Sequence, residues 1–322
     1  MIITRTPLRI SFTGGGTDIS DYYRINGGAV VSMAIDKYIY VTVNPKFDNS
    51  IRVSYSQTEI VAEVKELRHE LVREAMKMAR ITGGIEVTSI ADIPAGTGLG
   101  SSSTFTVGVL NALFTYCGKR LSGRQLAERA CQIEIDLLGH PIGKQDQYAA
   151  AHGGLNYFQF NADESVSYDR ITLSDDCWHD MNRRLMLFYT GITRSADGVL
   201  SEQKKNTASK LDNLNYMKRQ ADEMHKELVE TGFNAHFGEA LHLGWLKKQE
   251  LAGGITNSTI SALYEKALLA GAVGGKLLGA GGGGFLLFYC DEQNQAAVRN
   301  ALGLRQIDFR PDLYGSRVIY FA

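Results

Sequence analysis

The chain of 322 residues has little net charge, few cysteines and no long apolar run, and each absence removes a class of function. Its 34 basic residues nearly balance its 35 acidic ones, so no overall field draws it to nucleic acid or to an anionic membrane. Cys117, Cys131, Cys177 and Cys290 form no C-x-x-C pair, which favours buried free thiols in a reducing compartment. Any phosphate chemistry must therefore come from local sites.

No segment is typical of a signal peptide or a membrane span. The first residues, MIITRTPLRIS, lack an apolar core, and no apolar run approaches the ~20 residues that cross a bilayer. We therefore expect a soluble cytoplasmic protein with neither a membrane partner nor a nucleic-acid partner. The sequence does not indicate an oligomeric state.

Several catalytic motifs are also missing. The chain has no G-x-x-x-x-G-K-[ST] and no G-x-S-x-G, and its seven histidines show neither i, i+4 pairs nor cysteine companions. A P-loop, an acyl-transfer nucleophile and a structural zinc site are therefore poorly supported. Gly279, Gly281 and Gly284 satisfy G-x-G-x-x-G, but the strand-like FLLFYC follows where a dinucleotide-binding fold requires a helix. We interpret that match as coincidental.

Hydrophobic patterning predicts clusters of strands and clusters of helices. The expected strands cover residues 2–12, 29–43, 84–90, 155–160, 166–173, 184–190, 276–279, 284–289, 304–310 and 316–321. The expected helices cover residues 61–79, a stretch from about 101 to 116, another that follows a capping box of Ser122 and Gln125, four segments over roughly 194–271, and 293–301. Because these elements do not alternate strictly, the sequence favours an α+β fold over a doubly wound sheet. The chain is long enough for two domains, with a boundary near residues 175–185.

Three glycine-rich loops stand out: residues 14–18 (GGGTD), 94–103 (PAGTGLGSSS) and 279–284 (GAGGGG), which we name the first, middle and third glycine loops. Clustered glycines suggest positive φ angles or a close approach of the backbone, although tight turns explain any one loop alone. The middle loop places three glycines and three serines before a helix, where free amides and the helix dipole favour an anion. A polyphosphate would fit it, whereas a capped helix start explains only one serine.

Glu134 is the first acidic candidate for chemistry. It shares a helical stripe with Ala127, Cys131 and Leu138 beside the main apolar face. We therefore expect its carboxylate to be at least partly buried and to need a metal ion or a basic partner. The alternative is a boundary residue whose carboxylate reaches solvent.

Asp146 is the second acidic candidate. It precedes QYAAA, where an aspartate is a good helix N-cap. The functional alternative is a carboxylate held near a reacting hydroxyl, and Lys144, two residues earlier, could keep that carboxylate ionised. The pattern by itself leaves both roles open.

In this order, the three loops resemble those of the galactokinase, homoserine kinase, mevalonate kinase and phosphomevalonate kinase superfamily (GHMP kinases). The matching segments run from TPLRISFTGGGTD to KLLGAGGGGFLLF, and PAGTGLGSSS is the most specific of them. Residues 6–23, 143–154 (GKQDQYAAAHGG) and 189–196 (YTGITRSA) look most like bacterial D-glycero-D-manno-heptose 7-phosphate kinases and the related L-fucose kinases. Gly15 and Gly16 stand where the galactokinase loop has a Glu-His pair, which argues against galactose as the substrate.

The resemblance implies a two-domain fold, with an N-terminal ATP-binding domain over residues 1–180, a C-terminal domain over residues 181–322 and the active site in the cleft between them. It implies ATP and Mg²⁺, with Ser102 and Glu134 holding the metal. Asp146 would be catalytic, and Arg9 its basic partner, offsetting charge on the transferred group. The residues implied to bind ATP are Pro94, Ala95, Gly96, Thr97, Gly98, Leu99, Gly100, Ser101, Ser102 and Ser103. Those expected around the acceptor are Gly15, Gly16, Thr17, Asp18, Lys144, Arg194, Gly281, Gly282 and Gly283.

We therefore expect a sugar kinase that transfers the γ-phosphate of ATP to the anomeric hydroxyl of D-glycero-D-manno-heptose 7-phosphate. An acceptor that already carries a phosphate requires a second cationic pocket, for which Lys144 and Arg194 are candidates unless both are surface charges. L-fucose or another hexose is the alternative acceptor. One alternative from another class is a non-catalytic sensor that binds ATP and sugar, which the intact Asp146, Glu134 and Arg9 disfavour. The other is an ATP-dependent decarboxylase, which the GGTD and KQDQY segments disfavour.

Overall fold

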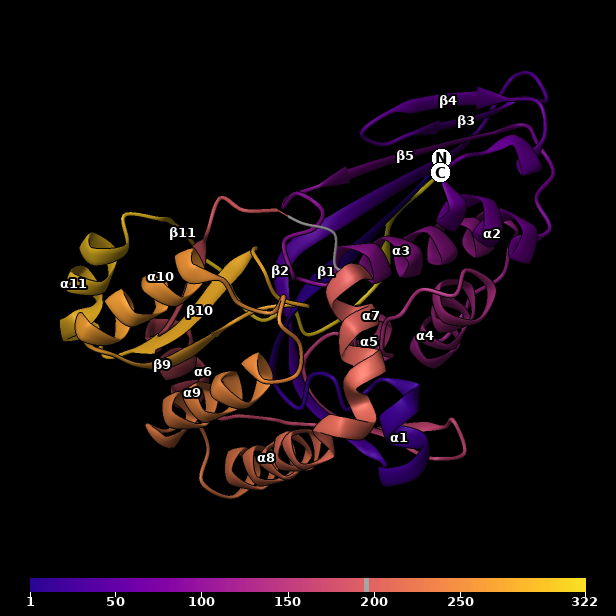
Figure 1. Ribbon diagram of the computed structural model, residues 1–322. Helices are drawn as coiled ribbons and strands as arrows, with labels where there is room; N and C mark the ends of the chain where they lie inside the picture. Colours follow the sequence, from indigo (N-terminus) through magenta and orange to yellow (C-terminus); the bar gives the residue numbers. More distant parts are fainter. Residues whose placement is uncertain (194–196) are drawn as a thin grey trace.

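The computed structural model describes residues 1–193 and 197–322, which form two β-sheets with helices packed against them (Figure 1). The strands of the larger sheet are β1 (Ile2–Thr13), β2 (Gly28–Pro45), β3 (Ile51–Ser54), β4 (Thr58–Val61), β5 (Ile85–Ala91), β6 (Leu155–Phe160), β7 (Val166–Arg170) and β12 (Arg317–Phe321). Those of the smaller sheet are β8 (Leu185–Tyr189), β9 (Ala272–Leu277), β10 (Phe285–Cys290) and β11 (Arg305–Ile307). The predicted α+β class is confirmed.

The helices cluster around these sheets. The α-helices are α1 (Ser20–Asn26), α2 (Glu70–Ala79), α3 (Ser101–Tyr116), α4 (Gly123–Cys131), α5 (Gln145–His152), α6 (Asp175–Arg184), α7 (Asp197–Asn206), α8 (Leu211–Glu230), α9 (His236–Gln249), α10 (Ser258–Leu269) and α11 (Glu292–Leu302). Short 3₁₀ turns are η1 (Val64–Glu66) and η3 (Thr207–Lys210), and η2 (Gln132–Leu137) is π-helical. In Figure 1 the smaller sheet and α9, α10 and α11 lie on the opposite side from α2, α3 and α4.

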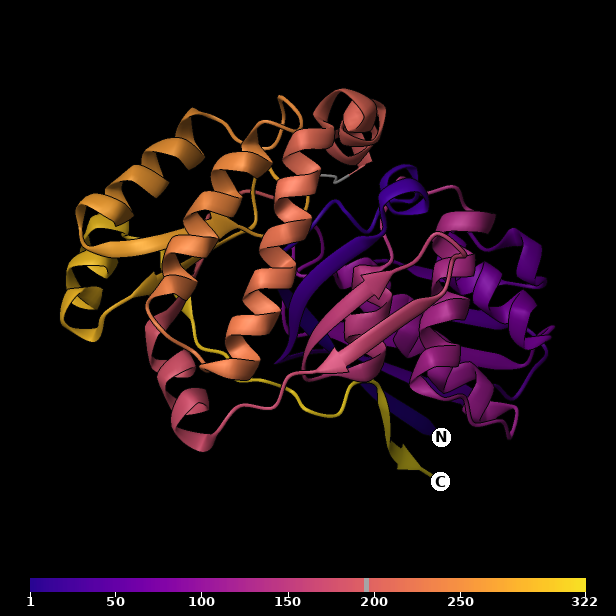
Figure 2. The ribbon, with the colours of Figure 1, turned by 90° about the horizontal axis from the view of Figure 1, so that it is seen from below.

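The larger sheet has the order β12-β1-β2-β5-β3-β4, and β6 and β7 extend it from β2. Its last strand in sequence, β12, pairs antiparallel with its first, β1. The two termini meet there, as Figures 1 and 2 both show, and the Met1 amino group donates a hydrogen bond to the Ala322 carbonyl oxygen at 2.6 Å. The final residues of the chain therefore belong to the sheet that its first residues begin.

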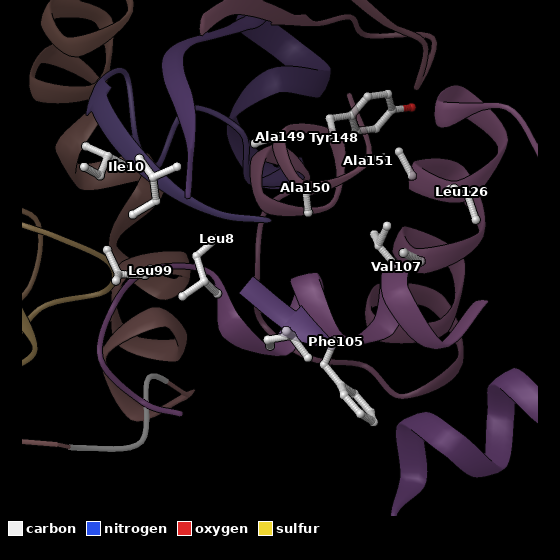
Figure 3. Close-up of a cluster of buried hydrophobic side chains, with 14 of the residues drawn as sticks. Leu8, Ile10, Leu99, Phe105, Val107, Leu126, Tyr148, Ala149, Ala150 and Ala151 are labelled. Carbon is white, nitrogen blue, oxygen red and sulfur yellow. The ribbon is translucent and has the colours of Figure 1, made fainter. Parts of the chain in front are cut away.

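Helix α3 lies at the centre of the N-terminal half. It is buried on nearly every side, because β1, β2, α2, α4 and α5 all pack against it. Most of its buried side chains are therefore apolar. Figure 3 shows part of this core, where Leu8 and Ile10 of β1 gather with Val107 of α3, Leu126 of α4 and residues of α5. This packing fixes β1, the start of α3 and α5 relative to one another, and those three elements carry the site.

The sequence prediction fails in a few places. The expected helix over 61–79 begins only at Glu70, because the Glu59 carboxylate accepts hydrogen bonds from the amides of Arg68 and His69 and holds that segment out of a helix. The short helices α1 and α6 were not predicted. The helix after the capping box of Ser122 and Gln125 is confirmed, but it continues as the π-helical η2.

Two further expectations concern the chain as a whole. Among the described residues, no helix is long and apolar enough to cross a membrane. All four cysteines are free thiols. Cys131 and Cys290 are buried as expected, whereas Cys117, at the C-cap of α3, is exposed.

Candidate active site

A cavity of about 710 Å³ is lined from both halves of the chain. The N-terminal half contributes Arg9, Asp18 and Asp146, and the C-terminal half contributes Lys248 and Lys276. All three glycine loops supply lining residues. Motifs that are far apart in the sequence therefore meet around one space.

The middle and third glycine loops pack backbone against backbone. A Cβ on Gly98 would lie 2.4 Å from the Leu278 carbonyl oxygen, and one on Gly279 would lie 2.3 Å from the Cα of Gly98. Both glycines have positive φ angles, +84° and +74°. At these two positions the glycines serve the contact between the loops, since any side chain would push them apart.

The middle loop ends at the start of α3. Its N-cap is Gly100, in the left-handed region with φ 76°, and no side chain caps the helix. The interpretation of one serine as an N-cap is therefore wrong. Ser101, Ser102 and Ser103 form the first turn of α3 and all line the cavity. An uncapped helix start with three hydroxyls suits a polyphosphate, because its amides and dipole favour negative charge.

Arg9 and Asp146 form a bidentate ion pair on the cavity wall. Arg9 Nε donates to Asp146 Oδ1 at 2.7 Å and Arg9 Nη2 to Oδ2 at 2.8 Å. Arg9 lies on β1 and is 4% exposed, and Asp146 lies in the first turn of α5. The N-cap position of α5 is occupied by Lys144 instead, so the N-cap interpretation of Asp146 is wrong. Such planar two-point pairing fixes the orientation of the carboxylate.

Arg9 also ties β1 to the middle loop. Its Nη1 donates to the Gly98 carbonyl oxygen at 2.7 Å, and its backbone amide donates to the Leu99 carbonyl oxygen at 3.1 Å. Gly100 lies against the pair, because a Cβ there would be 3.2 Å from Asp146 Oδ2. The carboxylate of Asp146 is therefore adjacent to the start of α3.

Glu134 is completely buried, so the alternative of a solvent-reaching carboxylate is wrong. It lies in the π-helical η2, a local geometry often found at functional sites. Ser102 Oγ donates to its Oε1 at 2.9 Å, and Gln147 Nε2 donates to its Oε2 at 2.7 Å. Burial raises the pKa of the Glu134 carboxyl, while the hydrogen bonds from Gln147, Ser103 and Ser102 oppose that rise.

The surroundings of Glu134 fit a hard divalent cation. Within the described residues, every recorded hydrogen-bond donor to its carboxylate is neutral. A buried carboxylate beside a hydroxyl offers two oxygen ligands, and Mg²⁺ is usually bound by one or two carboxylates together with substrate phosphates and water. Residues 1–193 and 197–322 contain no group of three or more His, Cys, Asp or Glu that could hold a metal by themselves.

The first glycine loop presents Asp18 to the cavity. Asp18 is 3% exposed, and its carboxylate accepts hydrogen bonds from the amides of Gly16 at 2.9 Å and Gln145 at 3.2 Å. A Cβ on Gly143 would lie 1.9 Å from Asp18 Oδ2 and 2.9 Å from the Asp18 carbonyl oxygen, so a side chain at this position would displace Asp18. Burial raises the pKa of Asp18, and the negative charge of Asp146 raises it further.

The structure does not bring every expected residue to the cavity. The hydroxyl of Thr17 is fully buried and bonds to the carbonyl oxygens of Gly14 and Ala29, so it shapes the first loop. Arg194 lies outside the described residues. The expected residues that line the cavity are Arg9, Gly15, Gly16, Asp18, Ala95, Gly96, Gly98, Gly100, Ser101, Ser102, Ser103, Asp146, Gly281 and Gly283. Those that do not are Pro94, Thr97, Leu99, Glu134, Thr17, Lys144 and Gly282.

Lys144 has a different partner from the one expected. Its Nζ donates to Glu164 Oε2 at 2.5 Å and lies 4.8 Å from the centre of the Tyr23 ring. The cation that pairs with Asp146 is Arg9, which is 137 residues away in the sequence. The hypothesis that Lys144 supports Asp146 is therefore wrong.

Sequence reasoning missed two buried lysines on the cavity wall. Lys248, in the last turn of α9, is 6% exposed, and Lys276, on β9, is 4% exposed. Burial lowers the pKa of Lys248 to about 8, with help from the positive charge of Arg9. Burial, together with the charges of Lys248 and Arg9, holds the pKa of Lys276 well below its usual range. A lysine beside Lys247 near a helix end is usually exposed, so the pattern gave no signal for Lys248.

Comparison with known proteins places this chain in a family. The family model for the GHMP kinases N terminal domain matches residues 63–154. The family model for the GHMP kinases C terminal domain matches residues 224–306. The chain is 30% identical over 325 residues to the D-glycero-alpha-D-manno-heptose 7-phosphate kinase of Campylobacter jejuni, covering 95% of this chain and 94% of that protein. It is 30% identical over 335 residues to the L-fucokinase/L-fucose-1-P guanylyltransferase of Bacteroides fragilis, covering 92% of this chain but 35% of that protein.

A solved structure shares the fold. The D-glycero-D-manno-heptose 1-phosphate kinase from Bacteroides thetaiotaomicron superposes with a TM-score of 0.83 at 24% identity, with full coverage of both chains. With both family matches and 30% identity over nearly the whole chain, the protein belongs to the GHMP kinases. The expected family, fold class and phosphotransferase activity are confirmed, and ATP is the phosphate donor of this family.

Proposed function

We propose that this GHMP kinase is an ATP-dependent sugar kinase that phosphorylates the anomeric hydroxyl of D-glycero-D-manno-heptose 7-phosphate. The observation that carries the proposal is the Arg9–Asp146 pair, which lines the same cavity as the uncapped first turn of α3. The 30% identity to the heptose 7-phosphate kinase of Campylobacter jejuni supports the acceptor. The four free thiols support a cytoplasmic location.

Phosphoryl transfer requires alignment and charge neutralisation more than covalent chemistry. The amides and hydroxyls of the first turn of α3 hold the phosphates of ATP. Asp146 accepts or orients the proton of the sugar hydroxyl, and Arg9 keeps its carboxylate pointed at that hydroxyl. Mg²⁺, held by Ser102 and Glu134 when bound, would neutralise phosphate charge.

The acceptor sugar is held on the side of the first glycine loop. The Asp18 carboxylate lines the cavity and is already fixed by two backbone amides, so a sugar hydroxyl can donate to it without loss of side-chain freedom. The first loop and Asp146 then hold the sugar from two directions.

Replacing Asp18 by asparagine should raise the KM for the sugar by about tenfold or more, because a charge-assisted hydrogen bond is lost. The dissociation constant for ATP should stay within about twofold of wild type, since Asp18 belongs to the acceptor side of the cavity. Steady-state kinetics with each substrate varied in turn would measure both. Asp21→Asn is the matched control, because Asp21 lies three residues later and its side chain is 42% exposed. An unchanged KM for the sugar would contradict the role of Asp18.

Replacing Glu134 by glutamine should raise the Mg²⁺ concentration for half-maximal activity by about tenfold or more, as loss of a metal-site group usually does. Glutamine keeps the shape but removes the charge that a divalent cation needs. Electron paramagnetic resonance of Mn²⁺ in the presence of ADP gives a second readout that does not depend on turnover. The control is Asp136→Asn, an exposed carboxylate in the same π-helical segment. Equal metal affinity in Glu134→Gln and wild type would remove Glu134 from the site.

The acceptor is tested by an ADP-coupled assay over a panel of sugars and sugar phosphates, with NMR of the product to locate the new ester. We expect the highest kcat/KM on the heptose 7-phosphate, with the new phosphate on the anomeric oxygen. L-fucose is the second candidate, supported by the 30% identity to an L-fucokinase. A preference for L-fucose or another free hexose would reject the heptose proposal, and no ADP release on any member would favour a sensor.

A further inference from the structure

All three nitrogens of the Arg9 guanidinium already donate hydrogen bonds to groups of the protein. Two of its nitrogens bond to Asp146 and the third bonds to the Gly98 carbonyl oxygen, each at 2.7 or 2.8 Å. Its side chain is 5% exposed. Arg9 therefore positions the carboxylate and the middle loop, and it is poorly placed to neutralise the phosphoryl group as well. Besides the Mg²⁺ proposed at Ser102 and Glu134, a second positive charge at this end of the cavity would stabilise the charge on the transferred group.

Lys248 is a cation with donors to spare. Its Nζ donates to the Gly279 carbonyl oxygen on the third glycine loop. An ammonium group has three N–H donors, and across the described residues this is the one hydrogen bond recorded for it. Lys248 is buried yet lines the cavity. A buried charge with one neutral partner is costly, and an anion in the cavity would offset that cost.

The neighbours of Lys248 locate its ammonium at the reacting end of the cavity. The charges that act on it most are those of Arg9, Asp18 and Asp146. Its hydrogen-bond partner, Gly279, packs against Gly98 of the middle loop, where that loop leads into α3. The Gly98 carbonyl oxygen in turn accepts a hydrogen bond from Arg9, which holds Asp146. This chain of contacts places Lys248 on the part of the cavity wall that carries the proposed catalytic carboxylate, next to the loop that leads to the phosphates.

An acceptor phosphate is a less suitable partner for Lys248. In a heptose 7-phosphate the phosphate is attached at the far end of the carbon chain from the anomeric hydroxyl. A cation that lies close to Asp146 therefore lies close to the reacting hydroxyl and far from that second phosphate. The anion that reaches this position is the γ-phosphoryl group as it leaves ATP.

We propose that Lys248 binds the γ-phosphoryl group during transfer, while Arg9 acts as the positioning residue for Asp146. The inference rests on the proposed kinase reaction but does not depend on which sugar is the acceptor. In the reaction the bond between the γ-phosphorus and the β,γ-bridging oxygen breaks and a bond to the acceptor oxygen forms. ADP leaves with the bridging oxygen, the acceptor proton goes to Asp146 or solvent, and Lys248 keeps its own protons.

The test compares a nucleotide that carries a γ-phosphate with one that lacks it. Isothermal titration calorimetry would measure Mg²⁺-AMPPNP and Mg²⁺-ADP binding to wild type and to Lys248→Met. We expect AMPPNP to bind at least about tenfold more weakly to the variant, as for loss of a charge-assisted hydrogen bond. ADP affinity should change by less than about twofold. Lys247→Met, a partly exposed neighbour paired with Glu250, should leave both affinities unchanged.

Two results would overturn the proposal: equal weakening of AMPPNP and ADP, or full AMPPNP affinity in a folded Lys248→Met protein. Lys248→Arg guards against a folding defect, because it keeps the charge and should retain most of the AMPPNP affinity. Both measurements omit the sugar, so a wrong acceptor assignment leaves them intact. Conversely, normal nucleotide discrimination without activity on any sugar would reject the proposed function alone.

The pH dependence gives an independent readout. The charged groups that act on Lys248 are Arg9, Asp18 and Asp146, and the charge of Lys248 acts in turn on Lys276. Because its pKa is lowered to about 8, the free enzyme loses this ammonium as the pH rises through that value. AMPPNP affinity should therefore fall above about pH 8 in wild type, more steeply than ADP affinity. In Lys248→Arg this extra fall should disappear, since arginine stays charged, and its persistence would contradict the proposal.

Discussion

Replacement of Asp146 by asparagine lowers turnover by about 10²–10⁴-fold, the usual cost of losing a general base. Asparagine keeps the size of the side chain but removes its charge and one of the two oxygens that accept hydrogen bonds from Arg9. Mg²⁺-ATP binding should remain near the wild-type value, because the phosphates are held by the start of α3. The expected result is therefore a loss in kcat with little change in nucleotide affinity, measured by ADP release and by calorimetry.

The matched control is Asp176→Asn. Asp176 is an exposed carboxylate in the first turn of α6, as Asp146 is a carboxylate in the first turn of α5. The control therefore reports any general effect of removing a charge from the start of a helix, which is worth about 0.3–1 kcal/mol. Wild-type turnover in Asp146→Asn would refute the catalytic assignment, and equal losses in both variants would attribute the effect to stability.

Replacement of Gly98 by alanine should lower the free energy of unfolding by about 2–5 kcal/mol, because two costs combine. The residue has a φ of +84°, and its new Cβ would meet the Leu278 carbonyl oxygen at 2.4 Å. Neither atom can swing aside, because the position of the Cβ is fixed by the backbone of residue 98 and the carbonyl oxygen is itself a backbone atom. Such a change is a large part of the 5–15 kcal/mol that stabilises a typical domain.

Gly118→Ala separates the two costs. Gly118 also has a positive φ, +70°, but a Cβ there would meet nothing within 4 Å. Its replacement should cost only the conformational penalty of about 1–2 kcal/mol. Urea unfolding of both variants and wild type would give the difference, which reports the contact between the middle and third loops. Equal destabilisation of the two variants would mean that this contact is not tight.

The local pattern of the sequence predicts much of this structure. The capping box of Ser122 and Gln125 starts a helix as expected, since both residues act within one turn. The burial of Glu134 follows from its place on a helical stripe. The glycine loops follow from composition, because few other residues allow such backbone angles. In each case the signal and the structure lie within a few residues of each other.

What the sequence could not predict depends on contacts between distant segments. The strand β12 joins β1 across almost the entire chain. Lys144 was expected to support Asp146 because it is near in sequence, yet it pairs with Glu164. The burial of Lys248 depends on where α9 packs, and the residues next to Lys248 in the sequence do not indicate that position. Sequence patterning reports periodicity along one element, whereas partner choice between elements is decided by the assembled fold.

The most direct test is a crystal structure of the enzyme with Mg²⁺-AMPPNP and the heptose 7-phosphate. We expect the triphosphate to lie across the first turn of α3, with the anomeric hydroxyl within hydrogen-bonding distance of the Asp146 carboxylate, about 2.6–3.2 Å. The terminal phosphorus should lie between that hydroxyl and the bridging nitrogen of the analogue. A triphosphate bound elsewhere, or no space for a sugar between the terminal phosphorus and Asp146, would contradict the account.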